Sequence, residues 1–403
     1  MIMVRYNISS NTYLASISNY TNHNWLSIVS KKSMLFFVLA LTSCVSPEKS
    51  STKLNPNIKY DSIPIGADQL AFYYRYEIID RDGEMFVIAA NHADQCIDLF
   101  FNGNFEEKIV IPLEGPEAVT GSKSIGNFRY IEGSIFIPSR FYGFKSFDLA
   151  NKEQKIFLTS DDLNLGSYQT GNGMTFTQYQ TANISKDKKY TVFQVWHSEV
   201  TGNGSKKVYL NKYANTAIVD LQNKKIDMLQ IPYPEINNFE AISFGHLDLM
   251  TYEFIDDHRL LVAFQNSPEL RIVDIKDKII VNKTPAGVFE GFPTARTLSS
   301  SEAMDFDRRT DHYFKEPQYF QIGYDPYRKW IYRVYKSKTE ERTIFDYSQN
   351  RLLIMDLNFN ILYNEKLDPS IYPMLFPYKD GLVGLVKDVK TEQYLKLAFL
   401  KFE

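Results

Sequence analysis

The feature that most constrains the fold is a strand-and-turn unit that recurs six times between residue 70 and the end of the chain. In each unit a short turn leads into an apolar strand, and the first five units then carry an apolar–Asp–apolar tripeptide before a second tight turn and a further strand. An aspartate at this place can cap the turn by accepting backbone N–H bonds. The tripeptides are Ile97–Leu99, Phe147–Leu149, Val219–Leu221, Val273–Ile275 and Met355–Leu357.

One additional strand precedes every unit, so each unit supplies four strands. Helical periodicity is almost absent, and aromatic residues, which favour strands, make up 15% of the chain. The sequence therefore predicts an all-β fold, a six-bladed β-propeller with four-stranded antiparallel blades. Residues Ile58–Ile65 are expected to pair with the last blade and close the ring. The additional strands are Leu70–Ile79, Gly126–Ile131, Thr175–Ile184, Met250–Ile255, Tyr319–Tyr324 and Tyr372–Tyr378.

A leader pattern precedes the repeats. Two lysines, Lys31 and Lys32, come before the apolar run Met34–Leu41, and Thr42-Ser43-Cys44 follows. This is the order of a secretory signal, and its end resembles a bacterial lipobox, in which the cysteine is lipidated. The apolar run is too short to span a membrane, which takes ~20 residues. We therefore predict a lipoprotein anchored to the lipid bilayer through Cys44, in the bacterial cell envelope, facing the outer membrane or the periplasm.

The predicted organisation has three parts: residues 1–43 as an upstream segment with the signal peptide, 44–57 as a lipidated tether, and 58–403 as the propeller. Residues 1–30 are polar and precede the signal, so we expect translation to start downstream, near Leu26 or Val29. Cys96 is then the one remaining thiol and is expected to be buried. The net charge of −3 lacks the excess of basic residues that is typical of nucleic-acid-binding proteins.

In a four-stranded blade, the connections between strands one and two and between strands three and four lie on one face of the propeller, and the other connections lie on the opposite face. Every long insertion in this sequence is a connection of the second kind. Long loops in a compact domain are usually functional, and binding residues gather on loops that a rigid scaffold holds. We therefore expect a ligand or partner on the face that carries them, the long-loop face. The insertions are Ser160–Met174, His197–Lys207, Pro232–Leu249, Ala286–Pro317 and Lys336–Gln349.

The insertion Ala286–Pro317 carries most of the candidate binding residues. Its acidic residues and histidine could supply ligands to a hard cation such as calcium, and its two arginines could clamp a carboxylate or phosphate. The full calcium-loop pattern is not met, so a solvated polar loop is the competing interpretation and no cofactor is assigned. The candidate ligand-binding residues are Asp305, Asp307, Arg308, Arg309, Asp311 and His312, with His197 in a separate insertion.

The segment Glu316–Arg328, together with the lipobox and the six units, resembles an uncharacterised family of Bacteroidetes lipoproteins with a six-bladed propeller and a domain of unknown function. The likeness covers most of residues 55–403. Its motifs are structural, so no catalytic residue is implied. Within the segment, Asp325-Pro326 suits a turn, and the aromatic residues Tyr324 and Tyr327 are expected to pack between blades.

Two functions follow from the residues. The first is a non-catalytic binding module that meets a peptide, glycan or partner protein on the long-loop face. The alternative is a propeller hydrolase of the lactonase or glycosidase kind, with a metal or carboxylate site at the central channel. The nearest candidates for that site would be Glu302, Asp305, Asp307 and His312. No Gly-x-Ser-x-Gly elbow, His-Glu-x-x-His pair or phosphate loop is found, which favours the binding module.

Overall fold

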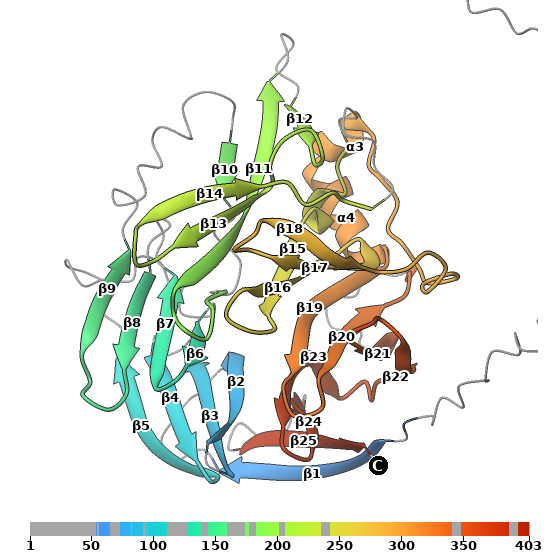
Figure 1. Cartoon of the computed structure of the whole chain (residues 1–403). Coiled ribbons are helices and arrows are strands. Elements are labelled where there is room, and N and C mark those ends of the chain that lie inside the picture. The colour runs from blue at the N-terminus through green and yellow to red at the C-terminus, as the bar shows by residue number, and fades with distance from the viewer. Residues whose placement is uncertain are drawn as a thin grey trace, which may run out of the picture. The chain divides into compact units, whose positions relative to one another are not determined.

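The computed structural model describes residues 54, 56–64, 73–81, 83–91, 94, 96–110, 128–138, 144–158, 174–176, 183–200, 206–234, 242–340, 348–386 and 394–402. The chain divides into two compact units, residues 1–51 and 52–403. The first unit, with the leader and Cys44, lies outside the described residues. The second is a six-bladed β-propeller, as the repeat predicts (Figure 1).

Each blade is an antiparallel sheet with its first strand nearest the propeller axis. Blade 1 contains β2 (Tyr73–Arg81), β3 (Glu84–Asn91), β4 (Cys96–Phe101) and β5 (Asn104–Val110). Blade 2 contains β6 (Arg129–Ile131), β7 (Ser134–Pro138), β8 (Phe144–Asp148) and β9 (Gln154–Leu158). Blade 3 contains β10 (Met174–Phe176), β11 (Tyr190–Val200), β13 (Thr216–Asp220) and β14 (Lys225–Leu229), with β12 (Lys206–Tyr209) added beside β11.

The last three blades follow the same order. Blade 4 contains β15 (Met250–Phe254), β16 (Arg259–Phe264), β17 (Ser267–Asp274) and β18 (Ile279–Lys283). Blade 5 contains β19 (Gln318–Asp325), β20 (Trp330–Lys336), β21 (Asn350–Asp356) and β22 (Ile361–Lys366). Blade 6 contains β23 (Ile371–Tyr378), β24 (Gly381–Val386), β25 (Tyr394–Phe402) and, as its outermost strand, β1 (Pro56–Pro64).

The pairing of β1 with β25 closes the ring, which confirms the expectation for residues 58–65. Their antiparallel register runs from Pro56 opposite Phe402 to Pro64 opposite Tyr394. Blade 6 is thus built from both ends of the propeller, and its last internal strand has no free edge. Loss of either strand would expose the ladder of the other.

Four of the five predicted turn aspartates cap their turns. The Oδ1 atom of Asp220 accepts bonds from the backbone N–H groups of Gln222 (3.0 Å) and Asn223 (2.9 Å), and Asp148, Asp274 and Asp356 do the same in their own blades. The prediction is wrong for Asp98, which is buried on β4 and accepts a bond from Asn91 Nδ2 (3.0 Å). Its turn comes only at residues 102–103, beyond the reach of this side chain.

Three of the predicted long loops contain regular structure. Residues 286–317 include the helices α3 (Ser300–Met304) and α4 (Phe306–Lys315), so the expectation of no helix is wrong here. Ser299 and Glu302 form a capping box at the start of α3. The expected loop at 197–207 is instead a hairpin, because β11 continues to Val200 and pairs with β12. A short 3₁₀ helix, η2 (Gly245–Leu247), lies in the insertion before β15.

Side chains from neighbouring blades interdigitate to form the core. Phe86 and Ile88 of blade 1, for example, pack with Ile135 and Phe147 of blade 2 in one buried cluster. The fully buried Arg333 in blade 5 reaches into blade 4, where its Nη1 donates to the carbonyl of Ser267 (3.1 Å). The blades are therefore joined by polar contacts as well as by apolar packing.

The direction of the strands decides which face each connection occupies. The first and third strands of a blade end at one face, and the second and fourth strands end at the other. The short turns, such as 102–103 and 132–133, lie on the first of these, which we name the short-connection face. All innermost strands run toward this face, so their C-terminal residues meet there around the axis.

Candidate functional site

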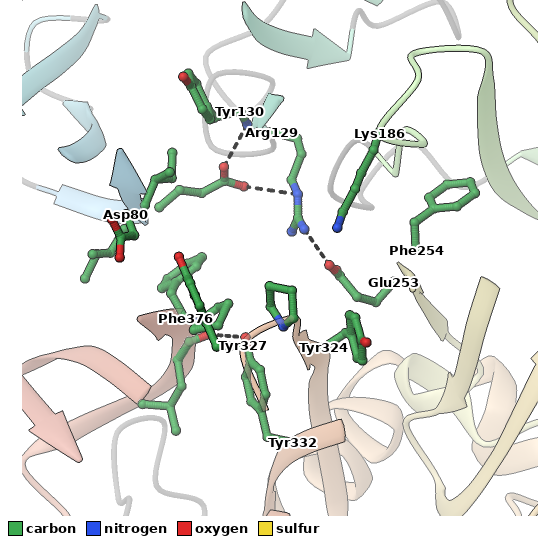
Figure 2. Close-up of a pocket in the computed structure, with 17 residues that line it drawn as sticks. Asp80, Arg129, Tyr130, Lys186, Glu253, Phe254, Tyr324, Tyr327, Tyr332 and Phe376 are labelled. Atoms are coloured by element: carbon green, nitrogen blue, oxygen red, sulfur yellow. Dashed lines mark hydrogen bonds and ion pairs between the residues drawn. The ribbon is translucent and has the colours of Figure 1, made fainter. Parts of the chain in front are cut away.

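A cavity at the centre of the ring opens at the short-connection face (Figure 2). It has a chamber of about 200 Å³ and an adjoining space of about 390 Å³ that shares its walls. The C-terminal halves of the innermost strands β2, β6, β15, β19 and β23 line it, and Lys186 comes from the connection before β11. This cavity therefore lies on the face opposite the one where the sequence predicts a ligand; binding on the long-loop face stays a prediction.

The cavity contains a network of charged side chains from three blades. Arg129 of β6 lies between two glutamates, with its Nη2 atom 2.5 Å from Glu253 Oε1 and its Nε atom 3.8 Å from Glu77 Oε1. The second oxygen of Glu77 accepts a bond from the backbone N–H of Tyr130 (2.7 Å). Figure 2 shows the guanidinium of Arg129 joined by a dashed line to the carboxylate of Glu253. One arginine thus ties blades 1, 2 and 4 together across the axis.

Burial controls the electrostatics of this network. It raises the pKa of Glu77 and of Glu253, although the charges of Arg129 and Arg75 act in the opposite direction. For Arg129, burial lowers the pKa, but the charges of Glu253 and Glu77 outweigh it and the pKa is raised overall. Arg75 lies two residues before Glu77 on the same face of β2 and is also buried, which lowers its pKa. Removing one partner would leave a buried charge uncompensated, so loss of any one member of the network is expected to be strongly destabilising.

Several polar groups of the cavity are open to a ligand. The ammonium of Lys186 points toward Glu253 (Figure 2), and its charge lowers the pKa of that glutamate. Within the described part of the chain, Lys186 forms no hydrogen bond or ion pair. The side chain of Arg129 is 26% exposed and that of Glu253 is 10% exposed. Donors and acceptors therefore lie side by side on the same wall.

Aromatic side chains form the opposite wall. Tyr324, Tyr327, Tyr332 and Phe376 line the chamber, and the Tyr332 hydroxyl donates to the carbonyl of Leu375 (3.0 Å). Tyr327 is 50% exposed. The expectation that these residues pack between blades is wrong for Tyr327, because the turn after β19 presents its ring at the mouth of the cavity. Such a mixture of apolar walls and few polar groups is typical of small-molecule sites.

The sequence-predicted candidates of the long-loop face are mostly engaged in the structure of the helices. Asp305 is the N-cap of α4 and accepts bonds from the N–H groups of Asp307 (2.9 Å) and Arg308 (3.1 Å). Arg308 pairs with Asp305 (3.7 Å) and Asp311 with Lys315 (3.7 Å). None of these residues lines the central cavity. In the described ranges, no group of three or more His, Cys, Asp or Glu side chains is placed to hold a metal ion.

Three other candidates have distinct positions. His312 is buried, its Nε2 donates to the carbonyl of Arg296 (2.7 Å), and burial lowers its pKa. Arg309 lies over the ring of Phe306, 5.9 Å from its centroid. Glu302 is paired with Arg296 and closes the capping box, and these bonds lower its pKa to about 2. The backbone of His197 pairs with Tyr209 in the hairpin, but its side chain lies outside the described residues.

Glu77, Arg129 and Glu253 were not among the residues that the sequence singled out. The pattern that could have indicated them is a charged residue within the first strand of a unit, the strand nearest the axis.

The prediction for the second cysteine is confirmed, since Cys96 is free and buried. Burial is the main cause that raises the pKa of its thiol to about 12, and the charge of Asp98 adds to it. The helices in the described part of the chain are not of the length and apolar character that membrane crossing requires.

Comparison with known proteins agrees with this architecture. No match was found among the curated proteins. A crystal structure of a DUF4221 family member from Bacteroides vulgatus is similar with a TM-score of 0.62 and 15% identity, over 88% of this chain and 99% of that one. A Bacteroides fragilis protein named as exported gives a TM-score of 0.49 and 9% identity, over 86% and 95% of the two chains. The model of DUF4221, a domain of unknown function, matches residues 56–366. The chain therefore belongs to the DUF4221 family.

Proposed function

We propose that this protein is a non-catalytic binding module of the cell envelope and that its ligand is a small polar molecule held in the central cavity. The observation that carries the proposal is the wall on which Arg129, Glu253 and Lys186 lie, facing the aromatic residues of blades 5 and 6. A preformed cavity with apolar walls and a few converging polar groups is the usual form of such a site.

The same wall favours binding over hydrolysis. A glycosidase needs one carboxylic acid that donates a proton and a second carboxylate that acts as base or nucleophile. Here Glu77 and Glu253 share a single guanidinium. The charge of Arg129 acts on both against the burial that raises their pKa, so the pair has no carboxyl group apart from this guanidinium to serve as a separate acid.

The leader supports placement in the envelope. Lys31–Cys44 has the order of a lipoprotein signal, and lipidation of Cys44 would hold the propeller at a bilayer, since each buried CH₂ contributes roughly 0.8 kcal/mol. The propeller would then present its cavity to solutes of the envelope compartment.

The proposal is tested by isothermal titration calorimetry with a panel of neutral sugars, amino acids, organic acids and nucleosides. We expect at least one panel member to bind with one-to-one stoichiometry. Lys186→Ala should weaken that binding by about tenfold, since a hydrogen bond to a charged group contributes roughly 1.5–3 kcal/mol. Tyr327→Ala should weaken it by about tenfold because it removes the aromatic ring at the mouth of the cavity.

The matched controls are Lys276→Ala, an exposed lysine in a turn of blade 4, and Phe105→Ala, an exposed aromatic residue on β5. Both should bind like the unaltered protein. Absence of binding across the panel, or binding that survives both cavity substitutions, would contradict the proposal.

A further inference from the structure

We infer that the ligand of the central cavity is a neutral saccharide, an inference that rests on the proposed function and specifies its chemistry. Three features of the cavity support it: the balance of charges around it, the pairing of donors with acceptors, and the exposed aromatic rings at its mouth.

The charges around the cavity nearly balance. Arg75, Arg129 and Lys186 supply three positive charges, and Glu77, Asp80, Glu253 and the exposed Glu132 supply four negative ones. All of these except Arg75 line the cavity, and Arg75 lies directly beside Glu77. A ligand with a net charge would lose its hydration and meet at most one unpaired opposite charge, at the exposed edge, and desolvation of an unpaired ion is costly. The wall therefore favours a ligand that is polar but neutral.

The open polar groups match hydroxyls. Arg129 and Lys186 can only donate hydrogen bonds, whereas a carboxylate such as that of Glu253 can only accept them. Asp80 is also a carboxylate, but it already accepts a bond from the backbone N–H of Gly83 (2.8 Å). A hydroxyl both donates and accepts, so adjacent hydroxyls of one ring can accept from the cations and donate to the carboxylates. Charge-assisted bonds of this kind are roughly twice as strong as neutral ones. A free amino acid offers no comparable row of groups that serve both roles, and a nucleoside offers only the hydroxyls of its ribose.

The aromatic wall accounts for the rest of the ligand. Tyr327 is half exposed at the mouth, and Tyr324 lies on the same strand-and-turn segment. Their rings offer rigid, amphipathic contact area at low entropic cost, which suits the apolar C–H face of a sugar ring. The combined space, about 200 Å³ and about 390 Å³, lies in the range of small-molecule sites rather than of macromolecular grooves.

The experiment compares three classes of probe on the full chain by calorimetry: neutral mono- and disaccharides, the uronates glucuronate and galacturonate, and the free amino acids lysine, arginine and glutamate. We expect a neutral saccharide to bind with one-to-one stoichiometry and the matching uronate to bind no tighter. The saccharide Kd should change by less than about twofold between roughly 50 and 500 mM salt, because no ion pair forms with the ligand.

Substitutions separate the contributions. Tyr327→Ala and Lys186→Ala should raise the saccharide Kd by about tenfold, Tyr327→Phe keeps the ring and should stay within about threefold, and the Lys276→Ala control should not change it.

Selective binding of a uronate or an amino acid that the same substitutions weaken would overturn the saccharide inference and leave the proposed cavity site intact. Saccharide binding that these substitutions do not weaken, or no binding in any class, would overturn both.

Discussion

Replacement of Asp248 by asparagine should make the protein more stable at alkaline pH and leave it little changed in acid. Asp248 follows η2 and is buried. Its carboxylate accepts bonds from the N–H of Phe244 (2.6 Å) and the hydroxyl of Ser243 (2.9 Å). Burial raises its pKa from 3.8 to about 7, and these two bonds only partly oppose the shift.

The sign of the effect follows from where the proton binds. Between about pH 4 and pH 7 the folded protein holds a proton on Asp248 that the unfolded chain has released, so stability falls as pH rises. With the pKa values of 3.8 and about 7, the loss between about pH 5 and pH 8 is roughly 2–3 kcal/mol. Asparagine has no such titration. Its carbonyl oxygen can accept from the N–H of Phe244, and its amide group can donate to the hydroxyl oxygen of Ser243, so its stability should lack this decline.

The assay is urea unfolding of the purified protein and Asp248→Asn at several pH values between about 5 and 8. The difference in unfolding free energy should shift toward the variant by roughly 2–3 kcal/mol as pH rises. Asp220→Asn is the matched control: the folded-state pKa of Asp220 is lowered from 3.8, so its stabilisation is lost only in stronger acid, and between about pH 5 and pH 8 its profile should run parallel to that of the unaltered protein. Parallel pH profiles for the unaltered protein and Asp248→Asn would refute the reasoning.

Three further predictions concern the ring, the cavity and the leader. Removal of residues 394–403 takes away β25 and leaves β1 unpaired, so the cooperative thermal transition should be lost in calorimetry; a truncated chain that still melts cooperatively would contradict ring closure. Gly323→Ala should lower the unfolding free energy by about 1–3 kcal/mol, because its new Cβ would overlap the ring of Tyr332; unchanged urea unfolding would contradict this overlap. Cys44→Ala should release the protein from sedimented membranes, and continued sedimentation would count against lipidation.

The sequence predicted the features that depend on local pattern. The strand order and the turns at Asp148, Asp220, Asp274 and Asp356 each depend on a few adjacent residues, and the structure confirms them. Asp98 shows the limit of such a pattern, since the same tripeptide lies too far from its turn. The helix α3 also had a local signal, the capping box from Ser299 to Glu302, but the polar sequence around it hid any apolar periodicity.

The central cavity could not be predicted in the same way. Arg129 and Glu253 are 124 residues apart and meet only because the ring brings their strands to a common axis. Each is a single charged residue in a short strand, with no motif around it. Their pairing depends on the number and radial order of the blades, which no short window of sequence contains.

The closing strand also has a consequence for the orientation of the protein. Pro56 begins β1 opposite Phe402, at the side of the disc where the cavity opens. With a fatty chain on Cys44, the intervening link would reach at most ~40 Å even when pulled straight. The lipid would therefore be attached to the propeller through β1, on the side where the cavity opens, and within that distance of Pro56.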